Sequence, residues 1–154
     1  VQQLKAIVMI DKYSWIARIS IMTDEKTQRI KDTAAALFSG YTEEKPYELW
    51  LSFDKKLAKE MSRFVVGDMY ARDVLPRTTR QLVAIAALSA TGKQDELKLH
   101  IHAALNVGCT PKEIAEAIFQ IGVYAGTPAM NNALLTLRDV LEEHGLWPLD
   151  QKES

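Results

Sequence analysis

The sequence predicts an all-α fold, and three observations support this prediction. Apolar residues recur at intervals of three and four along most of the chain after residue 22, as they do on one face of a helix. Proline and threonine stand where these stretches begin and glycine stands where they end, which is typical of helix boundaries. The same region contains no alternating pattern of a strand. At 154 residues, the chain suits one domain with a sizeable core.

The chain divides into three predicted parts. Residues 1–22 show no sustained period and form an N-terminal extension. Two interpretations of this part stay open: an ordered segment that packs on a partner subunit, or residues that precede a natural start near Met22. Residues 23–145 form a single helical domain. Residues 146–154 form a loose tail that is anchored at Trp147.

The first half of the domain contains two predicted helices. Thr23 is a suitable N-cap for the first helix, which is predicted to run to about Ser39, with Gly40 in the left-handed position that ends it. Pro46 suits the first turn of the second helix, and Gly67 is predicted to end it. Five apolar residues between them recur at spacings of four, four, four and three, which indicates one helical face. They are Leu49, Phe53, Leu57, Met61 and Phe64.

A short turn over residues 68–74 separates these helices from the second half. Four more helices are predicted there, over residues 76–92, 94–107, 110–124 and 128–144. Thr110 and Glu113 form a capping box, the clearest start signal in the chain. Gly122 lies inside a helix, where it costs about 1 kcal/mol relative to Ala. A close approach by a neighbouring helix would explain it.

Composition excludes several classes of protein. The net charge of -1 and the pI of about 6.3 argue against nucleic acid as the main partner. The only cysteine, Cys109, cannot form an internal disulfide, a CxxC pair or a Cys-based zinc site by itself. A reducing, cytoplasmic setting is the simplest interpretation. No stretch of the sequence is long and apolar enough to span a membrane or to serve as a signal peptide.

His100 is the first candidate for chemistry. It lies at the edge of the apolar stripe that Leu97, Ile101 and Ala104 define on its helix. Glu96 lies one turn earlier on the same side, so its carboxylate is predicted to accept a hydrogen bond from the imidazole and fix its tautomer. Such a pair can act as a general acid or base. The alternative is a histidine at the edge of the core with an ordinary surface partner.

Other candidates lie at helix ends. Arg77 and Arg80 are in the first turn of their helix, where either guanidinium could hold a carboxylate. Tyr124 ends one helix, and Asn131 and Asn132 lie near the start of the next. A Tyr hydroxyl and an Asn amide can donate to an enolate oxygen. The alternatives are structural ion pairs for the arginines, a half-buried aromatic for Tyr124 and solvated side chains for the asparagines.

Two further residues are not assigned to the site. His102 points roughly opposite to His100, and a His-x-His pair on a helix chelates metal poorly because the rings diverge. It is predicted to lie at the surface or at a subunit contact, and no metal site is expected. Cys109 is predicted to be a small apolar filler in a turn, since no basic neighbour in the sequence would lower the pKa of its thiol.

Four motifs in a fixed order resemble a known family. They are Arg-x-x-Arg-x-Leu from Arg77, Glu-Leu-x-Leu-His-x-x-Ala-Ala-Leu-x-x-Gly from Glu96, Thr-Pro-x-Glu-Ile-x-Glu from Thr110, and Tyr-Ala-Gly-x-Pro-Ala from Tyr124. Their order and spacing are similar to those of the carboxymuconolactone decarboxylase family, and the likeness covers about residues 45–142.

The resemblance implies an all-helical bundle of the alkylhydroperoxidase D-like type that assembles as a homo-oligomer, a trimer or a hexamer. It implies a decarboxylase that uses neither a metal nor an organic cofactor. The peroxidase branch of this superfamily has a CxxC pair that would fall at Lys93 and Glu96, and a glutamate that would fall at Gln81. All three are missing, so thiol peroxidase activity is not expected.

The resemblance leads to a functional hypothesis. The substrate would be a small acidic metabolite such as a carboxylated lactone. Arg77 or Arg80 would hold its carboxylate, Tyr124 or an asparagine would stabilise the dienolate, and His100 with Glu96 would transfer the proton. Two alternatives stay open: a non-catalytic helical oligomer that binds a metabolite or a protein, and a redox partner of the peroxidase branch.

Overall fold

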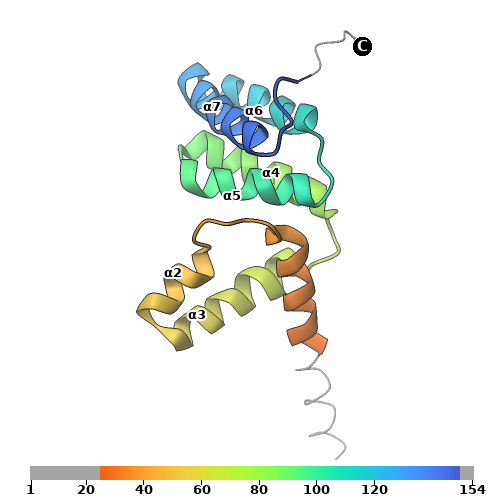
Figure 1. The fold of residues 1–154 in the computed structure, drawn as a ribbon, viewed down its shortest axis with the longest axis vertical. Helices are drawn as coiled ribbons and strands as arrows, with labels where there is room; N and C mark the ends of the chain where they lie inside the picture. The colour runs from red at the N-terminus through yellow and green to blue at the C-terminus, as the bar shows by residue number, and fades with distance from the viewer. Residues whose placement is uncertain (1–24, 150–154) are drawn as a thin grey trace, which may run out of the picture.

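The computed structural model describes residues 25–149, and every regular element in this range is a helix (Figure 1). The all-α prediction is therefore confirmed. The N-terminal extension, the proposed Thr23 cap and the end of the C-terminal tail lie outside the described residues. No helix in residues 25–149 is long and apolar enough to cross a membrane.

The helices form two groups. The first group contains a helix over residues 25–38, α2 (Pro46–Phe53), α3 (Lys55–Ser62) and the π-helix η1 (Arg63–Tyr70). The second group contains α4 (Arg77–Thr91), α5 (Gln94–Asn106), α6 (Pro111–Ala125) and α7 (Thr127–Glu143). Figure 1 shows the second group as a bundle, with the first group lying beyond α5.

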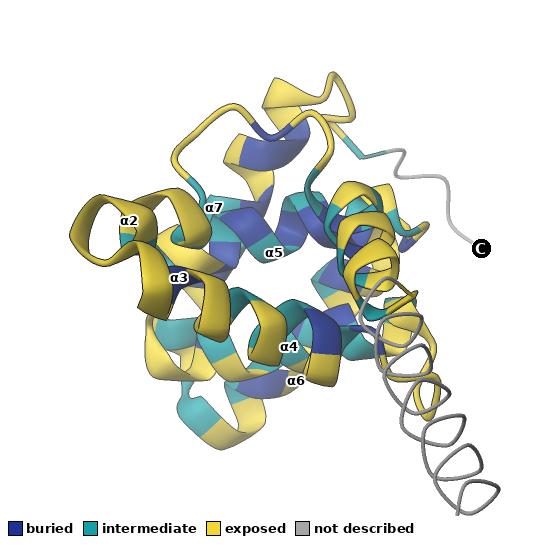
Figure 2. Ribbon diagram, turned by 90° about the horizontal axis from the view of Figure 1, so that it is seen from below, coloured by how far each residue is buried: buried dark blue, intermediate teal, exposed yellow. Residues whose placement is uncertain are grey.

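The core lies inside the α4–α7 bundle, where Figure 2 shows blue, buried bands on the facing sides of the helices. Each of the four helices contributes fully buried aliphatic side chains, and Cys109 lies among them. The largest are Ile85, Leu97, Ile101, Ile114, Ile118 and Leu141. The predicted place of Cys109 as a core filler is confirmed.

The boundary signals of this bundle act as predicted. The Thr110 hydroxyl accepts from the Glu113 backbone N–H at 3.2 Å, and the Glu113 carboxylate accepts from the Thr110 N–H at 2.7 Å. Gly92 has φ +69° and ends α4. A Cβ added at Gly122 would lie 2.8 Å from the Met130 sulfur of α7, so the predicted close approach of a neighbouring helix is confirmed.

The prediction of one continuous helix from Pro46 to Gly67 is wrong. The chain breaks at Asp54, which is extended (φ -151°, ψ 111°) and caps α3: its carboxylate accepts from the backbone N–H groups of Lys56 at 2.8 Å and Leu57 at 2.9 Å. A short acidic side chain that competes for backbone donors can end one helix and start another.

Gly67 does not end a helix, because η1 continues through it to Tyr70. It is buried, and a Cβ there would lie 2.7 Å from Ile30 Cγ1 of the first helix. The glycine thus allows η1 and the helix over residues 25–38 to pack closely.

The five apolar residues of the predicted face over residues 49–64 are all exposed in the single chain. Phe53 is the most exposed of them, at 86%. Their helical spacing correctly indicated helices, but the core of this chain does not cover them.

Candidate active site

A cavity of about 690 Å³ lies between the two groups of helices. The first helix, the start of α2, the end of α3, η1 and α5 contribute its walls. The lining residues are Ile30, Lys31, Ala34, Ala35, Phe38, Ser39, Lys45, Pro46, Tyr47, Trp50, Ser62, Val65, Val66, Tyr70, Leu99 and His100. It is mainly apolar, with a few polar groups, as small-molecule sites usually are.

α5 contributes Leu99 and His100 to the lining of this cavity, and of these two only His100 can be ionised. Its Nδ1 lies 2.8 Å from the Oε1 oxygen of Gln81, which α4 positions. An amide oxygen only accepts hydrogen bonds, so Nδ1 carries the hydrogen and Nε2 carries the lone pair. The imidazole also stacks on the Tyr70 ring of η1, with the ring centres 5.9 Å apart and the planes at 22°.

Burial lowers the pKa of His100 to about 4, and the nearby Glu96 carboxylate opposes part of this shift. The imidazole is therefore neutral at pH 7 in the free protein. A histidine with a fixed tautomer that faces an apolar cavity is suited to proton transfer once a ligand changes its surroundings.

Two buried donors lie beside this pair. Gln81 Nε2 and Arg80 Nε have no hydrogen-bond partner within the described part of the chain. The other end of the Arg80 guanidinium donates to the Arg72 carbonyl at 3.2 Å. Burial raises the pKa of the Tyr70 hydroxyl, and the charge of the nearby Arg80 opposes this shift.

Comparison with known proteins identifies the family of this chain. The sequence model described as the carboxymuconolactone decarboxylase family matches residues 55–139, more than half of the chain. The chain belongs to the carboxymuconolactone decarboxylase family.

Three relatives share parts of the chain. It is 41% identical over 96 residues to the 4-carboxymuconolactone decarboxylase of Acinetobacter baylyi, which covers 62% of this chain and 72% of that protein. It is 35% identical over 86 residues to an uncharacterised 15.0 kDa protein of Paracoccus denitrificans, covering 54% of this chain and 64% of the relative. It is 31% identical over 77 residues to the nitrosuccinic acid decarboxylase of Metarhizium robertsii, covering 50% and 54%.

The structure corrects the predicted partner of His100 in this family member. Glu96 is exposed, and the hydrogen bond expected from it is made by Gln81 instead. Residues four apart on one helix share a side, but the Gln81 amide reaches the ring from the neighbouring helix. In the sequence, Gln81 stands where the peroxidase branch has a glutamate. It lies 19 residues before His100 on the preceding helix, and helical periodicity does not pair positions on different helices.

The other predicted site residues do not line the cavity. Arg77 is exposed, and Arg80 is partly buried but does not belong to the lining of the cavity. Tyr124 is 81% exposed at the end of α6. Asn131 and Asn132 are exposed in α7, and Asn131 lines a second cavity of about 500 Å³ near the C-terminal tail. Within a single chain, Arg80 is the only one of these residues that lies near Tyr70 and so near His100, and the others are exposed.

The sequence pattern did not indicate the residues that close the cavity on the side of the first group of helices. They are Lys31, Phe38, Lys45, Tyr47, Trp50 and Tyr70. The chain reverses its direction at Asp54, so α2 and α3 form a hairpin (Figure 1), and residues between Phe38 and Trp50 line the cavity together with α5. Because one continuous helix was predicted from Pro46 to Gly67, the sequence did not indicate that these residues meet at a cavity.

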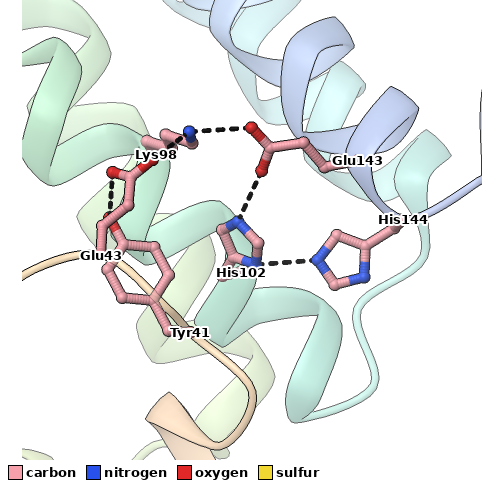
Figure 3. Close-up of polar contacts among 6 residues, drawn as sticks. All are labelled: Tyr41, Glu43, Lys98, His102, Glu143 and His144. Carbon is pink, nitrogen blue, oxygen red and sulfur yellow. Dashed lines mark hydrogen bonds and ion pairs between the residues drawn. The ribbon is translucent and has the colours of Figure 1, made fainter.

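His102 is not a free surface residue, and it takes part in a polar cluster within the chain (Figure 3). Its Nδ1 lies 2.8 Å from His144 Nε2, and its Nε2 lies 3.4 Å from a Glu143 oxygen. Lys98 bridges Glu143, at 2.8 Å, and Glu43. The cluster therefore joins the segment after the first helix to α5 and to the end of α7.

Two observations bear on metals and on thiol chemistry. In residues 25–149, no group of three or more His, Cys, Asp or Glu side chains is arranged to hold a metal ion. The Cys109 thiol is buried, lies 3.6 Å from the Thr78 carbonyl oxygen, and has a pKa raised by burial and by Glu113. A raised pKa keeps it protonated and unsuited to act as a nucleophile.

Proposed function

We propose that this protein is a cofactor-free carboxy-lyase that acts on a small organic acid. The substrate would carry an electron-withdrawing group near the carboxylate that is lost. When CO2 leaves, this group would delocalise the negative charge that remains on carbon. The observation that carries the proposal is His100, held in one tautomer by Gln81 at the wall of an apolar cavity, in a chain of this family.

The named substrates of two relatives support the reaction class. One relative is a 4-carboxymuconolactone decarboxylase and the other a nitrosuccinic acid decarboxylase. A conjugated lactone and a nitro group both accept the electron pair that CO2 leaves behind. A substrate with its own electron sink requires no cofactor for this step. A carboxylated lactone is the first substrate to test for the present chain.

The reaction needs one proton, and His100 can supply it. In the free protein the imidazole is neutral, since burial lowers its pKa to about 4. A substrate carboxylate that enters the cavity brings negative charge near the ring, which favours the protonated form, and the ring takes a proton from solvent. The C–C bond then breaks, CO2 leaves, and the electron pair passes into the enolate. The imidazolium gives its proton to carbon and becomes neutral again.

Charge on the substrate needs partners near the cavity. Lys31 and Lys45 lie in its lining, and Arg80, outside the lining, has one buried N–H without a hydrogen-bond partner in residues 25–149. Arg77, Tyr124, Asn131 and Asn132 are exposed in the single chain. Any part that these four residues play would require a neighbouring subunit of a trimer or hexamer.

The test is CO2 release by the wild type and by His100→Gln, with 4-carboxymuconolactone, nitrosuccinate and a flat monocarboxylic acid that carries its own electron-withdrawing group as the probes. Turnover should fall by roughly 10² to 10⁴ in the variant, the usual range for a positioned acid or base. His102→Gln is the matched control and should retain most of the activity, because Gln keeps polar contacts in the cluster of Figure 3. An equal loss of activity in both variants would contradict the proposal that His100 transfers the proton.

One observation favours a second candidate, a non-catalytic helical oligomer that binds a metabolite or a protein. His100 is largely buried and stacked on Tyr70, as a structural histidine would be. In that case, His100→Gln would lower the thermal stability strongly, and the wild type would release no CO2 from any acid. Circular dichroism melts of both proteins, beside the CO2 assay, separate the two functions.

A further inference from the structure

The cavity has an aromatic wall that faces α5. Phe38 of the first helix, Tyr47 and Trp50 of α2, and Tyr70 of η1 all line it. Trp50 and Tyr70 are partly buried, and Tyr70 already stacks on the His100 ring. Aromatic rings attract other flat rings through stacked or edge-to-face contacts, in addition to the burial of apolar area.

The same cavity offers little to a second negative charge. Among the lining residues only Lys31 and Lys45 are cations, and Lys45 already pairs with Glu48 at 3.5 Å. Lys31 makes no ion pair within residues 25–149 and is exposed, so it stands at the rim. A carboxylate buried without a partner is costly. The lining therefore suits an acid with one charge better than a compact acid with two.

The aromatic wall lies largely outside the part of the chain that the family model matches. Residues 55–139 contain Tyr70, Gln81 and His100, the groups around the proposed reaction. Phe38, Trp50 and the rest of the wall over residues 30–50 precede this match. The reacting side of the cavity thus lies within the residues that the family model matches, and most of the opposite wall precedes them.

We infer that the substrate of this protein is a monocarboxylic acid with an aromatic or similarly flat apolar body, which packs on Phe38, Tyr47 and Trp50. The inference rests on the proposed carboxy-lyase function and names its substrate class. Residues 30–50 select the body of the substrate, and the pair of Gln81 and His100 serves the reaction.

Calorimetric titration of the full-length protein tests the inference with three stable probes. They are 3-phenylpropanoate, succinate and 3-phenylpropan-1-ol, which separate the ring from the charge. The phenylpropanoate should bind with one molecule per chain, and about tenfold or more tighter than either of the others, because only it uses both the aromatic wall and a cation.

Three variants locate the site. Trp50→Leu should weaken the phenylpropanoate about threefold to tenfold, the usual worth of an aromatic contact. Trp147→Leu is the matched control, since Trp147 lines the second cavity near the tail, and it should leave binding unchanged. Lys31→Gln should weaken the acid but not the alcohol. Melting curves establish that each variant is folded.

Several outcomes would overturn the inference. Succinate could bind as tightly as the phenylpropanoate, or Trp147→Leu could weaken binding while Trp50→Leu does not. The acid could also fail to bind while Trp50→Leu changes the mass of the oligomer, which would show that a second copy of the chain fills the cavity.

Failure of the inference and failure of the proposed function give different results. His100→Gln should still bind the phenylpropanoate, because it leaves the aromatic wall intact, while it loses CO2 release. Binding as predicted without CO2 release from any acid would reject the carboxy-lyase but keep the ligand class. CO2 release without any preference for aromatic acids would keep the enzyme and reject the ligand class.

Discussion

His100 owes its chemical state to the two side chains that it contacts. Gln81 accepts the Nδ1 hydrogen at 2.8 Å, and Tyr70 covers one face of the ring. The first contact fixes the tautomer, and the second removes water from the imidazole. Glu96, on the same helix as His100, acts on it only through its charge.

Gln81 is therefore predicted to matter more for turnover than Glu96. Gln81→Leu removes the hydrogen bond to Nδ1, which is worth about 0.5–1.5 kcal/mol, so the rate should fall roughly threefold to tenfold. Glu96→Gln should change the rate less. Steady-state kinetics, together with the proton NMR titration of His100, provide the test. A larger loss of rate in Glu96→Gln than in Gln81→Leu would show that Glu96, as predicted from the sequence, is the more important partner of His100.

The state of His100 also predicts how stability depends on pH. Its pKa is about 4 in the folded protein and about 6.5 in the unfolded chain, so the unfolded chain binds more protons between these values. This contribution to stability is complete above about pH 6.5 and is lost as the pH falls towards 4. From pH 7 to pH 5, the free energy of unfolding should fall by roughly 2 kcal/mol more in the wild type than in His100→Gln.

Urea unfolding at the two pH values measures this difference. His102 also has a lowered pKa, caused by burial and by His144, so the variant keeps some pH dependence of the same sign. Identical pH profiles for the wild type and His100→Gln would mean that the imidazole is not buried as described.

Asp54 determines the shape of the first group of helices. It ends the regular path of α2 and caps α3 through two backbone hydrogen bonds. Without this side chain, the first turn of α3 loses acceptors for its N–H groups. The hairpin of α2 and α3 also contains Tyr47 and Trp50, which are two residues of the aromatic wall of the cavity.

Asp54→Ala is predicted to lower the free energy of unfolding by about 1 kcal/mol, the usual cost of removing an N-cap. For a chain of this size, the melting temperature should fall by roughly 2–4 °C. Asp139→Ala, at an exposed position inside α7, is the control and should be neutral or slightly stabilising, because Ala is the better helix former. A similar loss of stability in both variants would contradict the role of Asp54 as the N-cap of α3.

Several large apolar side chains in residues 25–149 are exposed in the single chain. Phe53, at 86% exposed, belongs to the α2–α3 hairpin, and Val123, at 82%, lies with Tyr124 near the end of α6. Contiguous exposed apolar side chains mark contact surfaces. Glu43, in the segment after the first helix, pairs with Lys98 of α5, so the ion pairs of Figure 3 join the two groups of helices within one chain.

We predict a trimer or a hexamer, in which these surfaces are covered. Light scattering at micromolar concentration should give three or six times the chain mass of 17.3 kDa. Val123→Asp places a charge on one of the surfaces and should lower the measured mass, since a buried unpaired charge is costly. A wild type that remains a monomer would contradict the prediction and would leave Tyr124 without a route to the site.

The sequence by itself determined the helical class, most of the boundaries and the family. Helix periodicity and caps such as Thr110 with Glu113 depend on residues within a turn or two of one another, so they can be read directly from the chain. The same reasoning placed Cys109 in the core and explained Gly122 by a close helix. His100 was identified as a candidate because its own helix shows where the apolar face lies.

Only the tertiary structure decided what His100 contacts and what the cavity is made of. Gln81 is 19 residues away on another helix, and Tyr47 and Trp50 of the aromatic wall come from a hairpin whose break at Asp54 was not visible in the helical spacing. Periodicity gives the direction of a side chain relative to its own helix axis. It does not give the packing between helices, and that packing brings Gln81, Tyr70 and the wall around one imidazole.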